Sequence, residues 1–189
     1  ITGGLGYIGT ELCKIYSGVS WYHKITVIDN RFISERVNQI RNWNMEFVHG
    51  DILDKELVKK YFADADIVHH LAGITDVPRT KSESSLDKDK KIKLVGEIGT
   101  KNILENISKN CKIIFPSTHV IYEGIDKVKN DIKEGEEPKP LLSYSSSKAT
   151  NEKQLKESGK NYIILRLGSV YGYSNDATRI DIMPNLFSK

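Results

Sequence analysis

The chain has 189 residues, of which 39% are hydrophobic and 28% are charged, a composition typical of a globular domain with a substantial core. Its net charge of +3 is too small to indicate nucleic acid or a membrane as a partner. The sequence shows no signal peptide and no apolar run near the roughly 20 residues of a membrane span. Cys13 and Cys111 lie far apart without metal-ligand spacing, so we expect a cytoplasmic protein with reduced, half-buried thiols and no metal.

Short apolar runs alternate with helical stretches along the chain, which favours a parallel sheet covered by helices on both faces. Strands are expected at Ile25–Ile28, Glu46–Val48, Ile67–Leu71, Lys112–Phe115 and Tyr162–Leu165. Helices are expected at Ile8–Tyr16, Lys55–Tyr61, roughly Lys91–Lys109, and Ser145–Glu157. The polar segment Lys81–Lys93 is interpreted as a solvated loop running into a helix, and Glu134–Pro140 as an exposed loop.

The chain opens on "ITGGLGYIGT", in which Gly3, Gly6 and Gly9 are spaced three residues apart. In such a turn the first glycine permits the tight bend, the second lets the backbone approach a pyrophosphate, and the third allows close helix–sheet packing. Free N–H groups and the positive end of the following helix then bind the anion. A plain tight turn is the alternative interpretation.

The second strand, "KITVID", ends at Asp29. An acidic side chain at this place can accept hydrogen bonds from the ribose hydroxyls of a dinucleotide. A carboxylate would also repel a 2′-phosphate, so the sequence favours NAD over NADP. Arg31, two residues later, leaves NADP open as the alternative.

Tyr144 and Lys148 are four residues apart and therefore lie on one face of a helix. A nearby ammonium stabilises a phenolate, which makes Tyr144 a candidate general base; a surface helix pair is the alternative. His69 and His70 are adjacent in an expected strand and point to opposite faces, so they cannot chelate a metal together and are interpreted as packing residues.

Seven segments, in the same order, resemble motifs of the extended short-chain dehydrogenase/reductases, the NAD-dependent epimerases and dehydratases that act mostly on nucleotide sugars. "TGGLGYIG" resembles the TGGxGxIG turn, "HHLAG" the HLAA strand end, and "YSSSK" matches YxxxK. The other four are "GDILD", "GTKNILE", "PSTHVIY" and "LRLGSVYG". The resemblance covers essentially the whole chain.

The resemblance implies a Rossmann-type doubly wound parallel sheet, with residues 1–168 as the NAD-binding domain and 169–189 as the start of a smaller C-terminal substrate lobe. In the strand order 3-2-1-4-5-6 the first strand is central, and here only Ile1 remains of it. We therefore expect the sequence to be an incomplete copy of a longer chain.

The resemblance also assigns site residues. Thr118, Tyr144 and Lys148 take the positions of the catalytic residues, with Lys148 bonding the nicotinamide ribose and Thr118 bonding the reacting oxygen. Thr118 and Ser169 are expected at the substrate. The expected cofactor contacts are Gly3, Gly6, Tyr7, Ile8, Gly9, Asp29, Asn30, Asp51, Ile52, Leu71, Ala72, Gly73, Ser117, Tyr144 and Lys148.

The implied activity is that of a nucleotide-sugar epimerase, with a one-way reductase or dehydrogenase and a catalytically idle NAD-binding regulator as alternatives. Family dehydratases carry Asp-Glu directly after the catalytic Thr, whereas this chain has His119 and Val120. The usual substrate-contacting Asn residues are replaced by Gly96 and Ser169. In the family, the long helix around Lys91–Lys109 and the YxxxK helix pair with their two-fold mates, so a homodimer is expected. Burial of the apolar positions of these helices against the sheet alone is the alternative interpretation.

Overall fold

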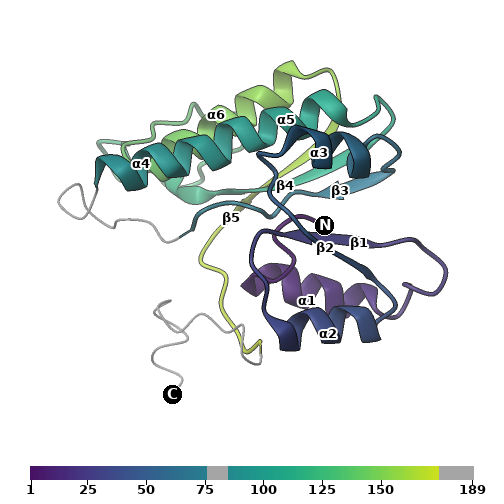
Figure 1. Ribbon diagram of the computed structural model, residues 1–189. Coiled ribbons are helices and arrows are strands. Elements are labelled where there is room, and N and C mark those ends of the chain that lie inside the picture. Colours follow the sequence, from purple (N-terminus) through teal and green to yellow (C-terminus); the bar gives the residue numbers. More distant parts are fainter. Residues whose placement is uncertain (76–84, 175–189) are drawn as a thin grey trace.

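Parallel strands and helices alternate along the chain, as the computed structural model shows for residues 1–75 and 85–174 (Figure 1). The strands are β1 (Thr26–Asp29), β2 (Glu46–His49), β3 (Ile67–His69), β4 (Lys112–Thr118) and β5 (Asn161–Leu167). The helices are α1 (Tyr7–Tyr16), α2 (Ser34–Asn42), α3 (Lys55–Phe62), α4 (Leu86–Lys93), α5 (Gly99–Asn106) and α6 (Ser143–Glu157). A π-helical turn, Leu94–Ile98, joins α4 to α5, and a 3₁₀ turn, His119–Tyr122, follows β4.

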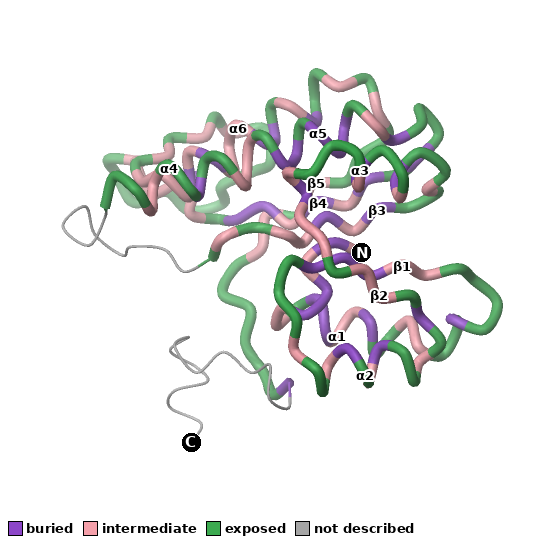
Figure 2. The backbone as a smooth tube through the Cα atoms, in the orientation of Figure 1, coloured by how far each residue is buried: buried purple, intermediate pink, exposed green. Residues whose placement is uncertain are grey.

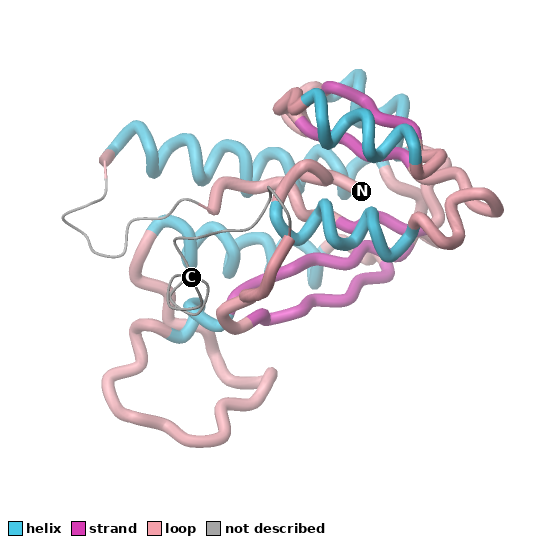
Figure 3. Tube along the Cα trace, turned by 90° about the horizontal axis from the view of Figure 1, so that it is seen from below, coloured by secondary structure: helices cyan, strands magenta, loops and turns pink. Residues whose placement is uncertain are grey.

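Thr2 joins two groups of parallel strands, β1–β2 and β3–β4–β5, by bridging Ile28 on one side and His70 on the other. Its N–H donates to the His69 carbonyl at 3.0 Å, and its own carbonyl accepts from Leu71 N–H at 3.2 Å. The N-terminus accordingly lies between the two groups of strands (Figure 3). The order β2-β1-Thr2-β3-β4-β5 is that of a Rossmann sheet, as expected, with Thr2 occupying the position of the central strand.

Helices cover both faces of this sheet, with α1 and α2 on one side and α3 to α6 on the other (Figure 1). Each face has its own core, because adjacent strand residues point in opposite directions. Val27 packs with Leu5 and Cys13 under α1 and α2, whereas Ile28 belongs to the larger cluster that includes Ile113. The centre of the sheet is therefore buried on both faces, and buried segments lie on the helices at either side (Figure 2). On β5, in contrast, Tyr162, Ile163 and Leu165 are 38%, 40% and 43% exposed.

The two cysteines differ from the expectation in one respect, because both are completely buried and not half-buried. Both are free thiols. Burial raises the pKa of Cys13 to about 11, so this side chain acts as a small apolar core group.

The structure differs from the expected helices in two places. Helix α2 was not expected, because "SERVNQIRN" is mostly polar and only Val37 and Ile40 are buried. The helix expected at Lys91–Lys109 begins already at Leu86, where the Ser85 hydroxyl caps it by accepting from Lys88 N–H. It is then interrupted by the π-helical turn and ends at Asn106.

The expected polar segment Lys81–Lys93 is thus helical from Leu86 onward, and its residues 81–84 lie outside the described part. Glu134–Pro140 lies in the loop before α6, as expected. Of the expected substrate lobe, residues 175–189 also lie outside the described part. Among the described residues, the helices are too short or too polar to cross a bilayer.

Candidate active site

A cavity of about 1300 Å³ lies where the strands of the sheet end and the glycine turn begins. The predicted catalytic, cofactor-binding and substrate-binding residues all line it, although they come from segments spread over most of the chain. They are Gly3, Gly6, Tyr7, Ile8, Gly9, Asp29, Asn30, Asp51, Ile52, Leu71, Ala72, Gly73, Ser117, Thr118, Tyr144, Lys148 and Ser169. The cavity is large enough for an extended ligand of the dinucleotide class.

The glycine turn is packed so closely that a side chain would not fit at Gly3, which contacts the segment after β3, or at Gly9, which contacts the turn itself. Gly3 has a φ of +66°, and a Cβ there would lie 2.8 Å from the Ala72 nitrogen. A Cβ at Gly9 would lie 2.3 Å from the Gly3 carbonyl oxygen. Helix α1 then starts with no side-chain cap and no acidic residue in its first turn. The positive end of α1 therefore lies at the cavity with no acidic side chain in its own first turn, an arrangement that suits a phosphate.

Asp29 is held in place by the glycine turn that it faces. Its side chain is 5% exposed and accepts hydrogen bonds from the backbone N–H groups of Leu5 and Arg31, each at 3.0 Å. The Arg31 Nε lies 3.4 Å from the same carboxylate, while most of the Arg31 side chain is in solvent. Oδ1 accepts from both Arg31 groups, whereas Oδ2 accepts from Leu5 N–H and retains a lone pair with which Asp29 can accept from a hydroxyl of a ligand.

The next strand end carries a second acidic side chain on the cavity wall. Asp51 accepts hydrogen bonds from the Asn30 side chain at 3.0 Å and from the Leu53 N–H at 2.9 Å. These bonds tie the ends of β1 and β2 together. Two carboxylates thus line one end of the cavity, as hydroxyl and amine donors of an adenosine would require.

Thr118, Tyr144 and Lys148 line the cavity from β4 and α6. The Lys148 Nζ donates to the Pro116 carbonyl at 2.7 Å. It lies 4.3 Å from the centroid of the Phe115 ring and 5.9 Å from that of Tyr144. Burial lowers the pKa of Lys148 to about 8, against the charge of Glu152, which raises it. The ammonium is therefore a buried donor next to the phenol, as the YxxxK spacing predicts.

Helix α6 begins with a cap that the sequence analysis missed. The Glu123 carboxylate accepts from the backbone N–H groups of Leu141 and Leu142, each at 2.7 Å, and from the Ser145 hydroxyl. An anion at a helix N-terminus satisfies free N–H groups and interacts favourably with the helix dipole. Glu123 thereby fixes the turn that presents Tyr144. Its distance in sequence from α6 gives no local pattern by which to recognise it.

The sequence analysis also did not predict several charged or titratable side chains that line the cavity. Lys88 and Lys91 on α4, Arg36 on α2 and His119 after Thr118 contribute cationic or titratable groups. The Arg36 guanidinium donates to the Leu5 carbonyl at 2.6 Å, and the His119 Nδ1 lies 3.1 Å from the Leu167 carbonyl oxygen.

His70 is completely buried behind the cavity, between the central strand position and α5. Its Nδ1 lies 2.9 Å from the Thr2 hydroxyl, and its Nε2 lies 3.0 Å from the Thr100 hydroxyl. The Thr2 hydroxyl also accepts from Ala72 N–H. Burial, followed by the charge of Lys148, lowers the pKa of His70 to about 3, so it is neutral near pH 7. His69 instead pairs with the Tyr16 hydroxyl at 2.8 Å, so the two histidines have separate structural contacts, as expected.

Curated proteins similar to this chain are enzymes that act on nucleotide sugars. A dTDP-D-glucose 4,6-dehydratase from Dictyostelium discoideum is 31% identical over 91% of this chain and 43% of its own length. A UDP-glucose 4-epimerase from Neisseria meningitidis serogroup C is 27% identical over 98% of this chain and 56% of its own length. The chain thus spans about half the length of the curated relatives that it matches.

Solved structures with the same fold include NAD complexes. The UDP-glucuronic acid 4-epimerase from Bacillus cereus, crystallised with NAD, is 26% identical, with a TM-score of 0.76 over 97% of this chain and 58% of its own. The UDP-glucose 4-epimerase from Thermus thermophilus, also with NAD, has a TM-score of 0.77 at 24% identity, over 99% of this chain and 59% of its own. The expected Rossmann fold is confirmed, and the expected cofactor, NAD, is the one found in these relatives.

The family model described as "NAD dependent epimerase/dehydratase family" matches residues 1–187. This match spans the glycine turn, the Asp29 strand end and the YxxxK helix, which are the elements that form the cavity. The chain therefore belongs to the NAD-dependent epimerase/dehydratase family.

Proposed function

We propose that this chain forms the NAD-binding and catalytic part of a nucleotide-sugar epimerase. The proposal rests mainly on one observation: the glycine turn and Asp29 line the same cavity as Thr118, Tyr144 and Lys148. NAD-bound relatives of the same fold include 4-epimerases.

The residues present fit a dinucleotide. The open N-terminus of α1 suits the pyrophosphate, and Asp29 suits the adenosine ribose hydroxyls. The Arg31 guanidinium already lies beside the Asp29 carboxylate, which favours NAD over NADP at this position. NAD, when bound, supplies the hydride acceptor and donor of the reaction.

The chain's own residues supply proton transfer and orientation. Tyr144 takes the proton from a sugar hydroxyl as the carbon that bears this hydroxyl is oxidised. It returns the proton when the resulting ketone is reduced on its other face. Lys148 stabilises the Tyr144 phenolate and donates to the nicotinamide ribose. Thr118 donates a hydrogen bond to the reacting oxygen. Proton and hydride are both returned, so the reaction has no net redox change.

The residues beyond Thr118 favour epimerisation over elimination of water. His119 and Val120 occupy the two positions where the resembling dehydratases carry Asp-Glu, and both line the cavity. Glu123 also lines it, but one of its carboxylate oxygens accepts three hydrogen bonds at the start of α6. Elimination needs a second acid–base group free to reach the sugar, and Glu123 is engaged in capping.

A panel of UDP-, GDP- and dTDP-sugars, incubated with the full-length protein and followed by proton NMR, tests this function. Inversion at one sugar carbon without net consumption of NAD supports the proposal. Stoichiometric consumption of NAD(P)H would instead identify a reductase, and loss of water a dehydratase. NAD binding without turnover of any sugar would favour the regulator.

A further inference from the structure

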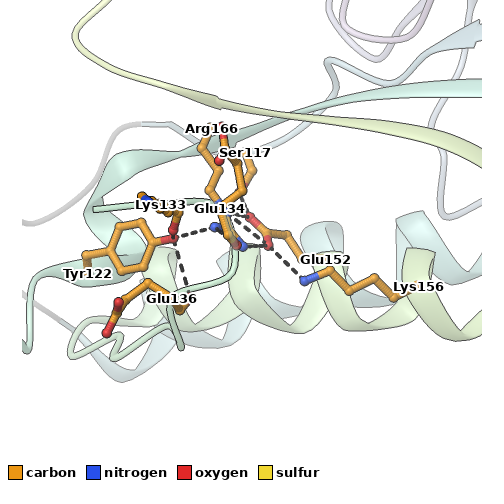
Figure 4. Close-up of polar contacts among 8 residues, drawn as sticks. All are labelled: Ser117, Tyr122, Lys133, Glu134, Glu136, Glu152, Lys156 and Arg166. Carbon is orange, nitrogen blue, oxygen red and sulfur yellow. Dashed lines mark hydrogen bonds and ion pairs between the residues drawn. The ribbon is translucent and has the colours of Figure 1, made fainter. Parts of the chain in front are cut away.

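Glu152 is a buried carboxylate behind the candidate active site that the proposed mechanism does not use. It lies on α6 one helical turn after Lys148 and is 1% exposed. Its polar partners come from β4, from β5 and from the next turn of α6 (Figure 4). A carboxylate in such a position is stable only when it is paired and hydrogen-bonded.

Its partners reach both the cavity and the loop before α6. The Ser117 hydroxyl, at the cavity wall, donates to Glu152 at 2.6 Å. Arg166, on β5, donates through Nε and through Nη2, the latter at 2.7 Å, in a bidentate pair (Figure 4). The same guanidinium donates to the Tyr122 hydroxyl and, at 2.8 Å, to the Glu134 carbonyl.

This network determines where the negative charge sits. Burial alone would raise the pKa of Glu152, but hydrogen bonds from Arg166 and Ser117 and the charges of Arg166 and Lys156 outweigh it, so that pKa lies below its ordinary value. Glu152 is therefore a fixed anion on the same face of α6 as Lys148 and Tyr144.

We propose that Glu152 is a positioning residue for the candidate active site: it orients the Ser117 hydroxyl and supplies the buried counter-charge for the Lys148 ammonium. This inference rests on the proposed function only in the role given to Lys148. The groups facing Lys148 from the elements around it are Tyr144 and Glu152 on α6, and His70 at the end of β3, which is neutral. Among these neighbours Glu152 is the anion, and its removal leaves the buried ammonium uncompensated.

The test is a pH titration of Lys148 in the full-length protein, labelled with ¹³C at lysine Cε and read by NMR without NAD or substrate. The Lys148 signal is assigned by its loss in Lys148→Met. In Glu152→Gln we expect the Lys148 midpoint to fall by at least about half a pH unit. Lys156→Met is the matched control, because Lys156 is half-exposed and lies 3.6 Å from the same carboxylate; its Lys148 midpoint should equal that of the wild type.

Removing Glu152 alone leaves Arg166 unpaired and can unfold the protein. The double variant Glu152→Gln/Arg166→Gln removes both charges together and is expected to fold. Because loss of the Arg166 cation acts on the Lys148 pKa in the opposite direction, the double variant is compared with Arg166→Gln, and its Lys148 midpoint should be the lower of the two. If Glu152→Gln folds with an unchanged Lys148 midpoint, or the double variant titrates like Arg166→Gln, the proposal is wrong and Glu152 serves only in a structural ion pair. The titration uses no sugar and therefore tests this inference separately from the proposed function. A protein without epimerase activity would refute the proposed function, but a lowered Lys148 midpoint in the same protein would still support the role of Glu152.

Discussion

Lys148 has a proposed role in catalysis, but its charge should lower the stability of the fold. Its ammonium is buried next to the apolar ring of Phe115. The folded-state pKa, about 8, lies below the ordinary value of 10.5. Between these two pH values the unfolded chain binds more protons than the folded one, so stability should rise as pH increases through this window.

Lys148→Met removes this buried charge while keeping an apolar side chain of similar length. We expect the free energy of unfolding at pH 7 to rise by about 1–3 kcal/mol, and the gain in stability between pH 8 and 10.5 to disappear. NAD affinity should fall because the ribose donor is lost. Denaturant unfolding across this pH range, with calorimetry for NAD, measures both effects. A variant less stable than the wild type at pH 7 would contradict the description of Lys148 as a buried, weakly compensated charge.

Asp29 is predicted to favour NAD over NADP. Asp29→Ala should weaken NAD binding by about 1–3 kcal/mol, or roughly 5- to 150-fold, because hydrogen bonds to a charged group are lost. Asn30→Ala, which alters the neighbouring side chain and leaves the carboxylate, is the control and should have a smaller effect. Isothermal titration with NAD and NADP on the full-length protein provides the comparison. Tighter binding of NADP than NAD by the wild type would show that the assignment of Asp29 is wrong.

The glycine turn, Asp29 and the Tyr144–Lys148 pair could be predicted from the sequence because their spacing has a physical reason, whereas the other predicted site residues came from the family resemblance. Glu123 and Arg166 could not be found in that way. Glu123 caps a helix that begins twenty residues later. The Arg166 side chain joins β5 to α6, to the 3₁₀ turn and to the loop before α6. Such contacts depend on the tertiary fold and leave no periodic signal.

At the scale of secondary structure, the π-helical turn fixes how α6 lies against its neighbours. The Gly96 and Glu97 carbonyls accept from the side chains of Asn151 and Gln154 at 3.0 and 3.1 Å. A Cβ at Gly96 would lie 2.3 Å from the Ser147 hydroxyl oxygen. This close approach leaves no room for a methyl group at Gly96 unless the Ser147 hydroxyl moves.

Gly96→Ala should destabilise the protein by about 1–3 kcal/mol, the usual effect of overpacking a tight contact. Gly135→Ala is the control, because a Cβ there would have no heavy atom within 4 Å. Thermal unfolding of the two variants measures the difference. Equal melting temperatures would mean that α6 adjusts freely and that the π-helical turn does not position it.

The strands and most helices were predictable because apolar runs and helical stretches follow the expected periods. Helix α2 was missed because only two of its nine residues are buried, which leaves almost no apolar stripe. The π-helical turn was missed because "LVGEI" has no local feature that distinguishes it from an α-helix; the packing of Gly96 against α6 is a tertiary feature.

For the whole molecule, an exposed apolar surface on α4 and the π-helical turn suggests a partner. Leu86 is 79% exposed, Leu94 50% and Ile98 43%. The sequence analysis predicts a homodimer through this helix layer, and closed symmetric pairs are the commonest soluble oligomers.

Leu94→Glu should therefore shift the full-length protein from dimer to monomer, because it places a charge in an apolar contact. Lys14→Glu, at an exposed position of α1 on the other side of the sheet, is the control and should leave the mass unchanged. Light scattering at micromolar concentration measures both. A monomeric wild-type protein under these conditions would remove the homodimer prediction.

The central claim is that Tyr144 is the general base of a nucleotide-sugar epimerase. Tyr144→Phe removes one hydroxyl group and keeps the ring beside Lys148, so NAD affinity and melting temperature should stay near the wild-type values. Its turnover number on the sugar found in the substrate screen is the most direct test. We expect that number to fall about 10²- to 10⁴-fold, as for a positioned acid–base group. Wild-type turnover in Tyr144→Phe would contradict both the role of Tyr144 and the epimerase mechanism.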